Sequence, residues 1–367
     1  MTELHGSYHP TQLQFLAYGP GCLFQLPAVL EKLECSGTKA FIITGKSLRD
    51  KTPVILHIEE LLGIHHAGTF SEISQHSPMS HIRRAVKFVN ESKADFLISV
   101  GGGSPIDSTK AISYEIHKSS GKWLPHIAIP TTLSAAEYTQ QAGFTNEEGN
   151  KTGVADPHII PRAVILDARL TTFTPETLWL SSGIRALDHA VELLYHPQAS
   201  EYPSKQLALR AIADLFEYLP KSKKDCDDID ARQHLQLAAF GSLFPFLFTG
   251  GIGLSHNLGR ALGATYSIGH GICSCLTLSA VVRYKSKNLP EASQISRILG
   301  PLGFTPTGSP EKDALIIAEK IDELIETLGL KTNLKEQNIP GGEAQVIAER
   351  AGHEGKQEII KLVEGLY

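Results

Sequence analysis

The chain has 367 residues, of which 42% are hydrophobic and 20% are charged, and its net charge is −5 at pH 7. This length allows two domains, because a single hydrophobic core seldom grows beyond about 250–300 residues. The mild negative charge gives no reason to expect nucleic acid or an anionic membrane surface as a partner.

The first part of the chain alternates strand-like and helix-like segments. Helical patterns cover residues 26–33 and 82–92, and apolar runs typical of buried strands cover residues 40–44, 96–100, 126–129 and 163–166. Strands separated by helices indicate a parallel, doubly wound sheet, whose ligands bind beyond the carboxyl ends of the strands. We therefore expect an α/β domain over residues 1–170.

A glycine-rich turn follows the second predicted strand. Gly101, Gly102 and Gly103 let the backbone turn sharply and approach a ligand closely. Ser104 is expected to cap the next helix, in a capping box with Asp107. Such a helix start presents free N–H groups and the positive end of the helix dipole, which predicts a phosphate or pyrophosphate site. The alternative is a tight turn without a ligand.

After about residue 170 the pattern becomes helical. Apolar residues recur at helical spacing over residues 203–219, 231–248, 312–328 and 357–363. The mixed-charge stretch 221–230 is typical of a solvated connection between helices. We therefore expect an all-α domain over residues 171–367.

Two segments of this half pair an arginine with a histidine on one helix face. Arg185 lies one turn before His189, and His256 lies one turn before Arg260. His270 follows in a third segment. The three histidines could converge on a divalent ion and leave a position open for a substrate oxygen. The alternative is that the sixteen histidines are scattered and any three can be selected.

The cysteines and the apolar runs indicate an intracellular location. The five cysteines, Cys22, Cys35, Cys226, Cys273 and Cys275, are odd in number and show no redox-pair or common zinc spacing. We expect all five to be reduced thiols. No secretory signal and no apolar run as long as a membrane span is present, so we expect a cytoplasmic protein.

The chain resembles the iron-containing (group III) alcohol dehydrogenase family with its maleylacetate reductase branch, which shares a fold with dehydroquinate synthase. The resemblance covers nearly the whole length. It rests on Tyr18-Gly19-Pro20-Gly21, Gly101-Gly102-Gly103-Ser104 with Asp107 and Lys110, Ile129-Pro130-Thr131-Thr132, Asn150-Lys151-Thr152-Gly153, Ser182-Gly183 with His189-Ala190-Val191-Glu192, and the block from His256 to His270. The resemblance implies a dehydroquinate synthase-like fold, NAD(P) as cofactor and a homodimer.

The resemblance also assigns the cofactor residues. The glycine turn would hold the pyrophosphate, the turn after the third strand would line the ribose and nicotinamide, and Lys151 would stand near the reacting end. The residues so implied are Gly102, Gly103, Ser104, Asp107, Thr131, Thr132, Ser134 and Lys151.

The end of the first predicted strand bears on the choice between NAD(H) and NADP(H). NAD-selective relatives often carry an aspartate there, which would repel a 2′-phosphate. In this chain the position resembles Gly45, followed by Lys46. An absent carboxylate and a nearby ammonium tolerate the extra phosphate, so NADP(H) is favoured. The alternative is that Lys46 is a solvated turn residue.

The family's metal site is altered in this sequence. Relatives usually hold iron or another divalent metal with three histidines and one aspartate. His189, His256 and His270 match the histidines, but the aspartate position is Arg185, whose guanidinium would repel a cation. Asp188 lies about 100° round the helix and cannot simply substitute. We therefore favour a metal-free or weakly metal-binding site over a three-histidine metal site, with Fe or Zn as the candidate ions.

The two arginines suggest a different chemistry. An additional active-site histidine of the family is similarly replaced, by Arg260. Together Arg185 and Arg260 could clamp a carboxylate, enolate or phenolate of the substrate. The alternative for Arg185 is an internal salt bridge with Glu192 or Asp188.

The leading hypothesis is an NAD(P)H-dependent reductase acting on a carbonyl or conjugated carbonyl of a small anionic molecule. Arg185 and Arg260 would stabilise negative charge on oxygen, His189 or His270 would donate the proton, and Lys151 would complete the catalytic set. One alternative is a non-redox enzyme on the same scaffold, catalysing a cyclisation, elimination or isomerisation. The other is a nucleotide-binding module without catalysis.

Overall fold

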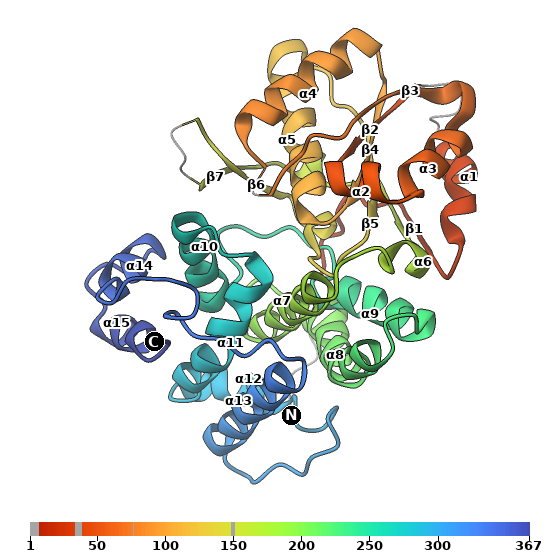
Figure 1. Cartoon of the computed structure of the whole chain (residues 1–367). Helices are drawn as coiled ribbons and strands as arrows, with labels where there is room; N and C mark the ends of the chain where they lie inside the picture. Colours follow the sequence, from red (N-terminus) through yellow and green to blue (C-terminus); the bar gives the residue numbers. More distant parts are fainter. Residues whose placement is uncertain (1–6, 34–38, 76, 148–150) are drawn as a thin grey trace. The chain divides into compact units, whose positions relative to one another are not determined.

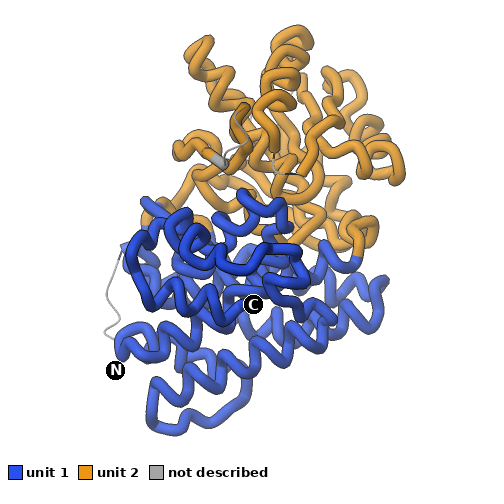
Figure 2. Tube along the Cα trace, turned by 60° about the vertical axis from the view of Figure 1, so that its left-hand side comes forward, with its two compact units in different colours: residues 1–8, 176–244, 248–367 blue, residues 9–175, 245–247 orange. Residues whose placement is uncertain are grey.

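The computed structural model describes residues 7–33, 39–75, 77–147 and 151–367. Two compact units make up the chain, and Figure 2 shows them in orange and blue. The sheet unit comprises His9–Pro175 with Pro245–Leu247, and the helical unit comprises Glu176–Phe244 and Phe248–Tyr367, together with Ser7 and Tyr8. Cys35 and Asn150, named above, lie outside the described residues.

The sheet unit contains six parallel strands in the order β1-β8-β5-β4-β2-β3. The strands are β1 (Phe15–Tyr18), β2 (Ala40–Thr44), β3 (His66–Phe70), β4 (Phe96–Gly101), β5 (His126–Pro130) and β8 (Ala163–Leu166). The helices are α1 (Leu26–Lys32), α2 (Lys46–Lys51), α3 (Val54–Leu62), α4 (Met79–Ser92), α5 (Gly103–Ser120) and α6 (Ala168–Thr171). An antiparallel hairpin of β6 (Gln141–Thr145) and β7 (Lys151–Ala155) completes the unit.

Both faces of this sheet are buried. Successive side chains alternate between two cores, with Ile42 and Ile98 packed toward α1 and α3, and Ile43 and Leu97 packed toward α4 and α5. Figure 1 shows these helix pairs on opposite sides of the strands. Each fully buried isoleucine contributes about 1.5–3 kcal/mol to folding. The prediction of a doubly wound parallel sheet is therefore confirmed.

The chain changes direction across the sheet between β2 and β4. From β2 the chain continues outward to β3, whereas from β4 it continues through β5 toward β8. β2 and β4 are nevertheless direct neighbours, with Thr44 opposite Val100. The turns that leave these two strands therefore diverge, and such a switch point is where open α/β sheets bind their ligands.

The helical unit is organised around α7 (Glu176–Tyr195), which contacts each of the next five helices. Those helices are α8 (Gln206–Lys224), α9 (Ile229–Ser242), α10 (Leu254–Tyr266), α11 (His270–Lys285) and α12 (Leu289–Ser296). They are followed by α13 (Pro310–Thr327), α14 (Ala344–Arg350) and α15 (Gln357–Glu364). From Trp179 to Leu194, every residue of α7 is buried except Arg185. The polar residues of this stretch therefore lie inside the unit: Ser181, Ser182, Asp188, His189 and Glu192.

Several predicted boundaries are wrong for identifiable reasons. The helix expected over residues 231–248 ends at Ser242, before Pro245, a residue that cannot continue a helix. α8 begins at Gln206 rather than at Pro203, which lies in a preceding π-helical turn, and it runs to Lys224. The short strands β1 and β3 and the β6–β7 hairpin were not predicted; β3 and the hairpin lack continuous apolar runs, whereas the apolar residues of β1 were overlooked.

Two further sequence expectations concern cysteines and membranes. Cys22, Cys226, Cys273 and Cys275 are free thiols, as expected. In the part of the chain that the structure describes, no helix combines the length and apolar character needed to cross a bilayer.

Candidate functional site

The turn between β4 and α5 depends on glycine. Gly101 has a φ of +133°, in the left-handed region that favours glycine. A Cβ atom on Gly102 would lie 3.0 Å from Thr132 Cγ2, and one on Gly103 would lie 3.2 Å from Ser134 Oγ. Side chains at these positions would push away the turn that follows β5. The glycines therefore let two turns of the sheet edge pack directly on each other.

The capping box predicted for α5 is wrong. The helix begins at Gly103 with Gly102 as its N-cap, because the chain has already turned at the preceding glycine, so Ser104 lies inside the first turn. The carboxylate of Asp107 accepts a hydrogen bond from the backbone N–H of Gly143 in β6, at 3.2 Å. Among the described residues, no side chain caps this N-terminus. Its N–H groups and helix dipole therefore suit an anion such as a pyrophosphate.

Two more turns reach the same edge of the sheet. Thr44 Oγ1 donates to the carbonyl of Val100 at 2.9 Å and ties the ends of β2 and β4 together. Gly45 then caps α2, and Lys46 is exposed at its first position. On the other side of β4, the Thr131 N–H donates to the last carbonyl of β4 at 2.9 Å. The carboxyl edge thus gathers the predicted residues of three turns, and this arrangement fits a dinucleotide.

Lys151 comes from a separate element. It is the first residue of β7, and its backbone pairs with Thr145 of β6. β6 in turn packs against α5. Its position near the reacting end of the cofactor stays a prediction.

The arginines and histidines predicted in the helical unit lie on three helices. Arg185 and His189 belong to α7, His256 and Arg260 to α10, and His270 opens α11. The ring centroids of His189 and His256 are 5.4 Å apart, and Arg185 Nη2 lies 3.1 Å from Nε2 and 3.3 Å from Nδ1 of His256. Each of the other four residues lowers the pKa of His256 by electrostatic interaction. We call these five residues the arginine–histidine cluster.

Electrostatics keep two of these imidazoles neutral. Burial lowers the pKa of His189 and of His256 well below the usual histidine value, and the charge of Arg185 lowers both further. His189 Nδ1 is buried and has no hydrogen-bond partner among the described residues. The cluster therefore presents a permanent positive charge beside neutral rings, an arrangement suited to a negatively charged group.

The geometry of the cluster is unfavourable for a divalent metal. The guanidinium of Arg185 stands against both ring nitrogens of His256, so an ion bound by that ring would meet a fixed positive charge. Within residues 7–367, leaving out those the structure does not describe, no group of three or more His, Cys, Asp or Glu side chains is arranged to hold a metal ion. As they are placed, these residues do not fit a metal.

Glu192 fixes the start of α10. Its carboxylate accepts the backbone N–H of Ser255 at 2.7 Å and that of His256 at 3.3 Å. A Cβ atom on Gly253 would lie only 2.3 Å from Glu192 Cδ, so this glycine allows the close approach. Burial raises the pKa of Glu192. Glu192 thus positions the helix that carries His256.

The two carboxylates considered as salt-bridge partners of Arg185 accept hydrogen bonds from other groups, although the charge of Arg185 counteracts the rise in the pKa of Asp188 that burial causes. Asp188 accepts a hydrogen bond from Ser274 Oγ of α11 at 2.7 Å, while Glu192 binds the α10 backbone. Arg185 places its guanidinium against His256. Asp188 therefore links α7 to α11, while Arg185 extends toward α10.

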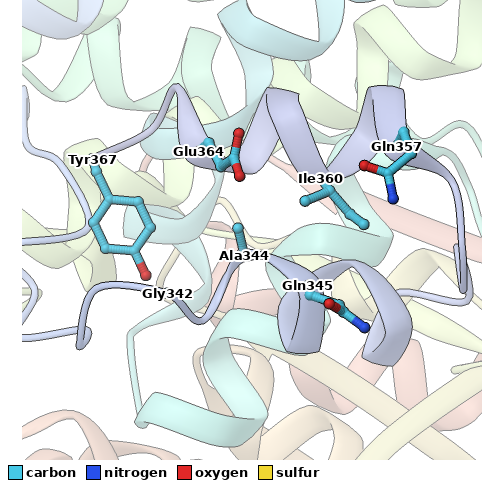
Figure 3. Close-up of a pocket in the computed structure, with 7 residues that line it drawn as sticks. All are labelled: Gly342, Ala344, Gln345, Gln357, Ile360, Glu364 and Tyr367. Atoms are coloured by element: carbon cyan, nitrogen blue, oxygen red, sulfur yellow. The ribbon is translucent and has the colours of Figure 1, made fainter.

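A separate pocket of about 420 Å³ lies against α14 and α15 (Figure 3). It is lined by Gly342, Ala344, Gln345, Gln357, Ile360, Glu364 and Tyr367. Its two glutamines and its glutamate are exposed, and none of its lining residues was predicted from the sequence as a site residue. We assign it no role in the candidate site.

Sequence reasoning missed three residues that shape these sites. Lys110 appeared in a motif but received no role, although it is fully buried. Glu192 was considered only as an ion-pair partner, and Gly253 was not considered. Two features could have indicated Glu192 and Gly253. One is the glycines that precede α10, and the other is the uninterrupted buried helix that carries Glu192.

Family models match both parts of the chain. Residues 14–168 match the model described as iron-containing alcohol dehydrogenase, and residues 179–360 match the C-terminal model of the Fe-containing alcohol dehydrogenase family. The dehydrogenase FUM7 of Gibberella moniliformis is 30% identical over 67% of this chain and 66% of its own length. A maleylacetate reductase of Sphingobium indicum is 29% identical over 85% of this chain and 82% of its own length.

Solved structures agree with these matches. A putative alcohol dehydrogenase from Ralstonia eutropha superposes with a TM-score of 0.85 and 26% identity, covering 99% of this chain and 98% of that chain. Maleylacetate reductase from Rhizobium sp. superposes with a TM-score of 0.83 and 24% identity, covering 100% of this chain and 99% of that chain. This similarity supports the fold.

Proposed function

The chain belongs to the iron-containing alcohol dehydrogenase family and is an NAD(P)H-dependent oxidoreductase acting on a carbonyl or conjugated carbonyl, and we propose that its substrate is a small anion bound through Arg185. The family resemblance and the dehydroquinate synthase-like fold expected from the sequence are thereby confirmed. One observation carries the proposal: Arg185 is the single residue between Trp179 and Leu194 that is not buried, and its guanidinium lies against a neutral histidine.

We assign cofactor binding to the sheet unit. The N–H groups at the start of α5, at Gly103 and Ser104, would bind the pyrophosphate, with Gly102 allowing the close approach. The hydroxyl groups of Thr131, Thr132 and Ser134 would orient the nicotinamide side. Bound NAD(P)H supplies the hydride.

We assign charge stabilisation to the arginine–histidine cluster. As the carbonyl oxygen becomes negative, Arg185 would donate hydrogen bonds to it or to the substrate's anionic group, with Arg260 as the second cation. Burial keeps His189 neutral, so it is a poor acid. His270, half-buried at the first position of α11, is the proton donor that we propose instead. No step in this scheme uses a metal.

A substrate panel tests the proposed function. Oxidation of NADPH is followed with 2-oxo and 3-oxo acids, conjugated enol acids, and neutral aldehydes of matched size. We expect the anionic carbonyl compounds to give the higher kcat/KM. Preference for the neutral aldehydes, or no turnover while NADPH binds tightly, would contradict the proposal. Membership of a redox family favours this reaction over the non-redox and binding-module alternatives.

We further propose that NADP(H) is preferred over NAD(H), with Lys46 facing the 2′-phosphate. Lys46→Gln is expected to lower kcat/KM for NADPH about tenfold, because a hydrogen bond to a charged group contributes about 1.5–3 kcal/mol. The value for NADH should stay unchanged. Lys51→Gln, at an exposed position of the same helix, is the control. An equal loss with both coenzymes would remove Lys46 from this role.

A homodimer and a cytoplasmic location remain part of the proposal. They rest on the family resemblance and on the thiol content of the chain. Light scattering on the purified protein measures the first, and fractionation of the source cells measures the second.

A further inference from the structure

Lys110 is a buried lysine in the helix that would hold the pyrophosphate. Its side chain is completely inaccessible to solvent. Nζ donates to the carbonyls of Thr139 at 2.7 Å and Gln141 at 2.9 Å, to Thr139 Oγ1 at 3.1 Å, and also to the carbonyl of Ala136. Burying an ammonium group is costly unless it is fully hydrogen-bonded, and these four oxygens satisfy it.

Asp107 makes the matching contact one turn earlier on α5. Its Oδ2 accepts the N–H of Gly143 at 3.2 Å, and its Oδ1 lies 3.9 Å from Lys110 Nζ. Two oppositely charged side chains of α5 therefore hold successive parts of one segment, residues 136–143. Asp107 directs its carboxylate toward this segment.

The segment held by α5 continues from the turn that carries the proposed cofactor hydroxyl groups. At the start of that turn, Thr131 donates its N–H to β4, and its carbonyl accepts the hydroxyl of Thr174 at 2.7 Å. Thr132 and Ser134 then lie against the glycine turn. Ala135 follows with a φ of +57°, a conformation that a non-glycine residue holds only when its surroundings impose it. The turn is therefore held at its start by the hydrogen bonds of Thr131 and beyond its end by Lys110, which binds residues 136–141.

We propose that Lys110, assisted by Asp107, is a positioning residue that holds the hydroxyl groups of Thr132 and Ser134 against the glycine turn and so sets the affinity for NADPH. This inference rests on the proposed function, because it assumes that the turn binds the coenzyme. Lys110 acts through the backbone of the segment and does not touch the coenzyme itself.

The test compares Lys110→Met, Lys110→Arg and Asp107→Ala with Lys118→Met, which removes an exposed lysine from the same helix. NADPH affinity is measured by fluorescence titration, folding by circular dichroism and thermal unfolding, and turnover by steady-state kinetics. We expect Lys110→Met to raise the Kd and KM for NADPH about tenfold or more, since small displacements of binding groups have large effects. We expect kcat at saturating NADPH to fall less than kcat/KM does, and Lys110→Arg to restore part of the affinity.

A merely structural lysine would lower the thermal midpoint without changing the Kd of the folded protein, and that result would overturn the inference. If Lys110→Met does not fold, Lys110→Arg decides: a Kd raised above the wild-type value with a normal spectrum supports the inference, and a wild-type Kd overturns it. Wild-type protein that binds neither NADPH nor NADH would overturn the proposed function and this inference with it. Normal wild-type binding with an unaffected variant would overturn this inference alone.

Discussion

Arg185→Ala is expected to lower kcat/KM for the best anionic substrate by about 10²–10³-fold, the usual effect of removing a donor that stabilises a developing oxyanion. The affinity for NADPH should remain unchanged, because the coenzyme residues belong to another set of elements. The loss follows from the geometry of the cluster, in which neutral His189 and His256 cannot replace the charge of Arg185.

Conservative and matched variants sharpen this prediction. Arg185→Lys keeps the charge but loses the planar set of donors, so it should recover only part of the activity. Arg210→Ala removes a largely exposed arginine from α8 and should leave kcat/KM within about twofold, as surface substitutions usually do. Stopped-flow and steady-state assays supply the rates. Full activity in folded Arg185→Ala would exclude the proposed role.

Arg185→Asp is expected to convert the cluster into a metal site. The substitution removes the cation that stands against His256 and supplies a carboxylate four residues before His189, on the same helix face. We expect the variant to bind Zn²⁺ or Fe²⁺ in a one-to-one ratio with His189, His256 and His270, whereas the wild type should take up only substoichiometric metal. Metal analysis after dialysis and Co²⁺ absorption spectra measure the difference.

The control for this experiment is Arg185→Asn, which removes the positive charge without adding a carboxylate ligand. It should bind metal more weakly than Arg185→Asp. If Arg185→Asp binds no metal, the three histidines cannot converge on one ion, and Arg185 is not what prevents metal binding. If the wild type already binds one equivalent, Arg185 does not prevent binding.

The sequence was sufficient to predict the parts of the fold that local pattern determines. The strand at 163–166 was predicted with its observed limits, because its four residues form an apolar run, and the structure buries all four. The glycine turn after β4 was predicted because three successive glycines have few other uses. The shared face of Arg185 and His189 follows from helix periodicity alone.

What the sequence could not supply depends on contacts between distant segments. The burial of Lys110 could not be inferred from its residue type, since lysine is almost always exposed, and it becomes clear only from the carbonyls of residues 136–141 around its ammonium. The N-cap at Gly102 rather than Ser104 depends on where the chain turns. Likewise, the contact between Arg185 and His256 requires α7 and α10 to be neighbours, which no local pattern specifies.

We propose that a fixed guanidinium, rather than a bound metal, provides the positive charge for catalysis. The most direct measurement is the rate of NADPH oxidation by wild-type protein dialysed exhaustively against a chelator, with its metal content determined on the same sample. If the guanidinium supplies this charge, the rate stays undiminished at substoichiometric metal. Loss of the rate, with recovery on addition of Fe²⁺ or Zn²⁺, would contradict it.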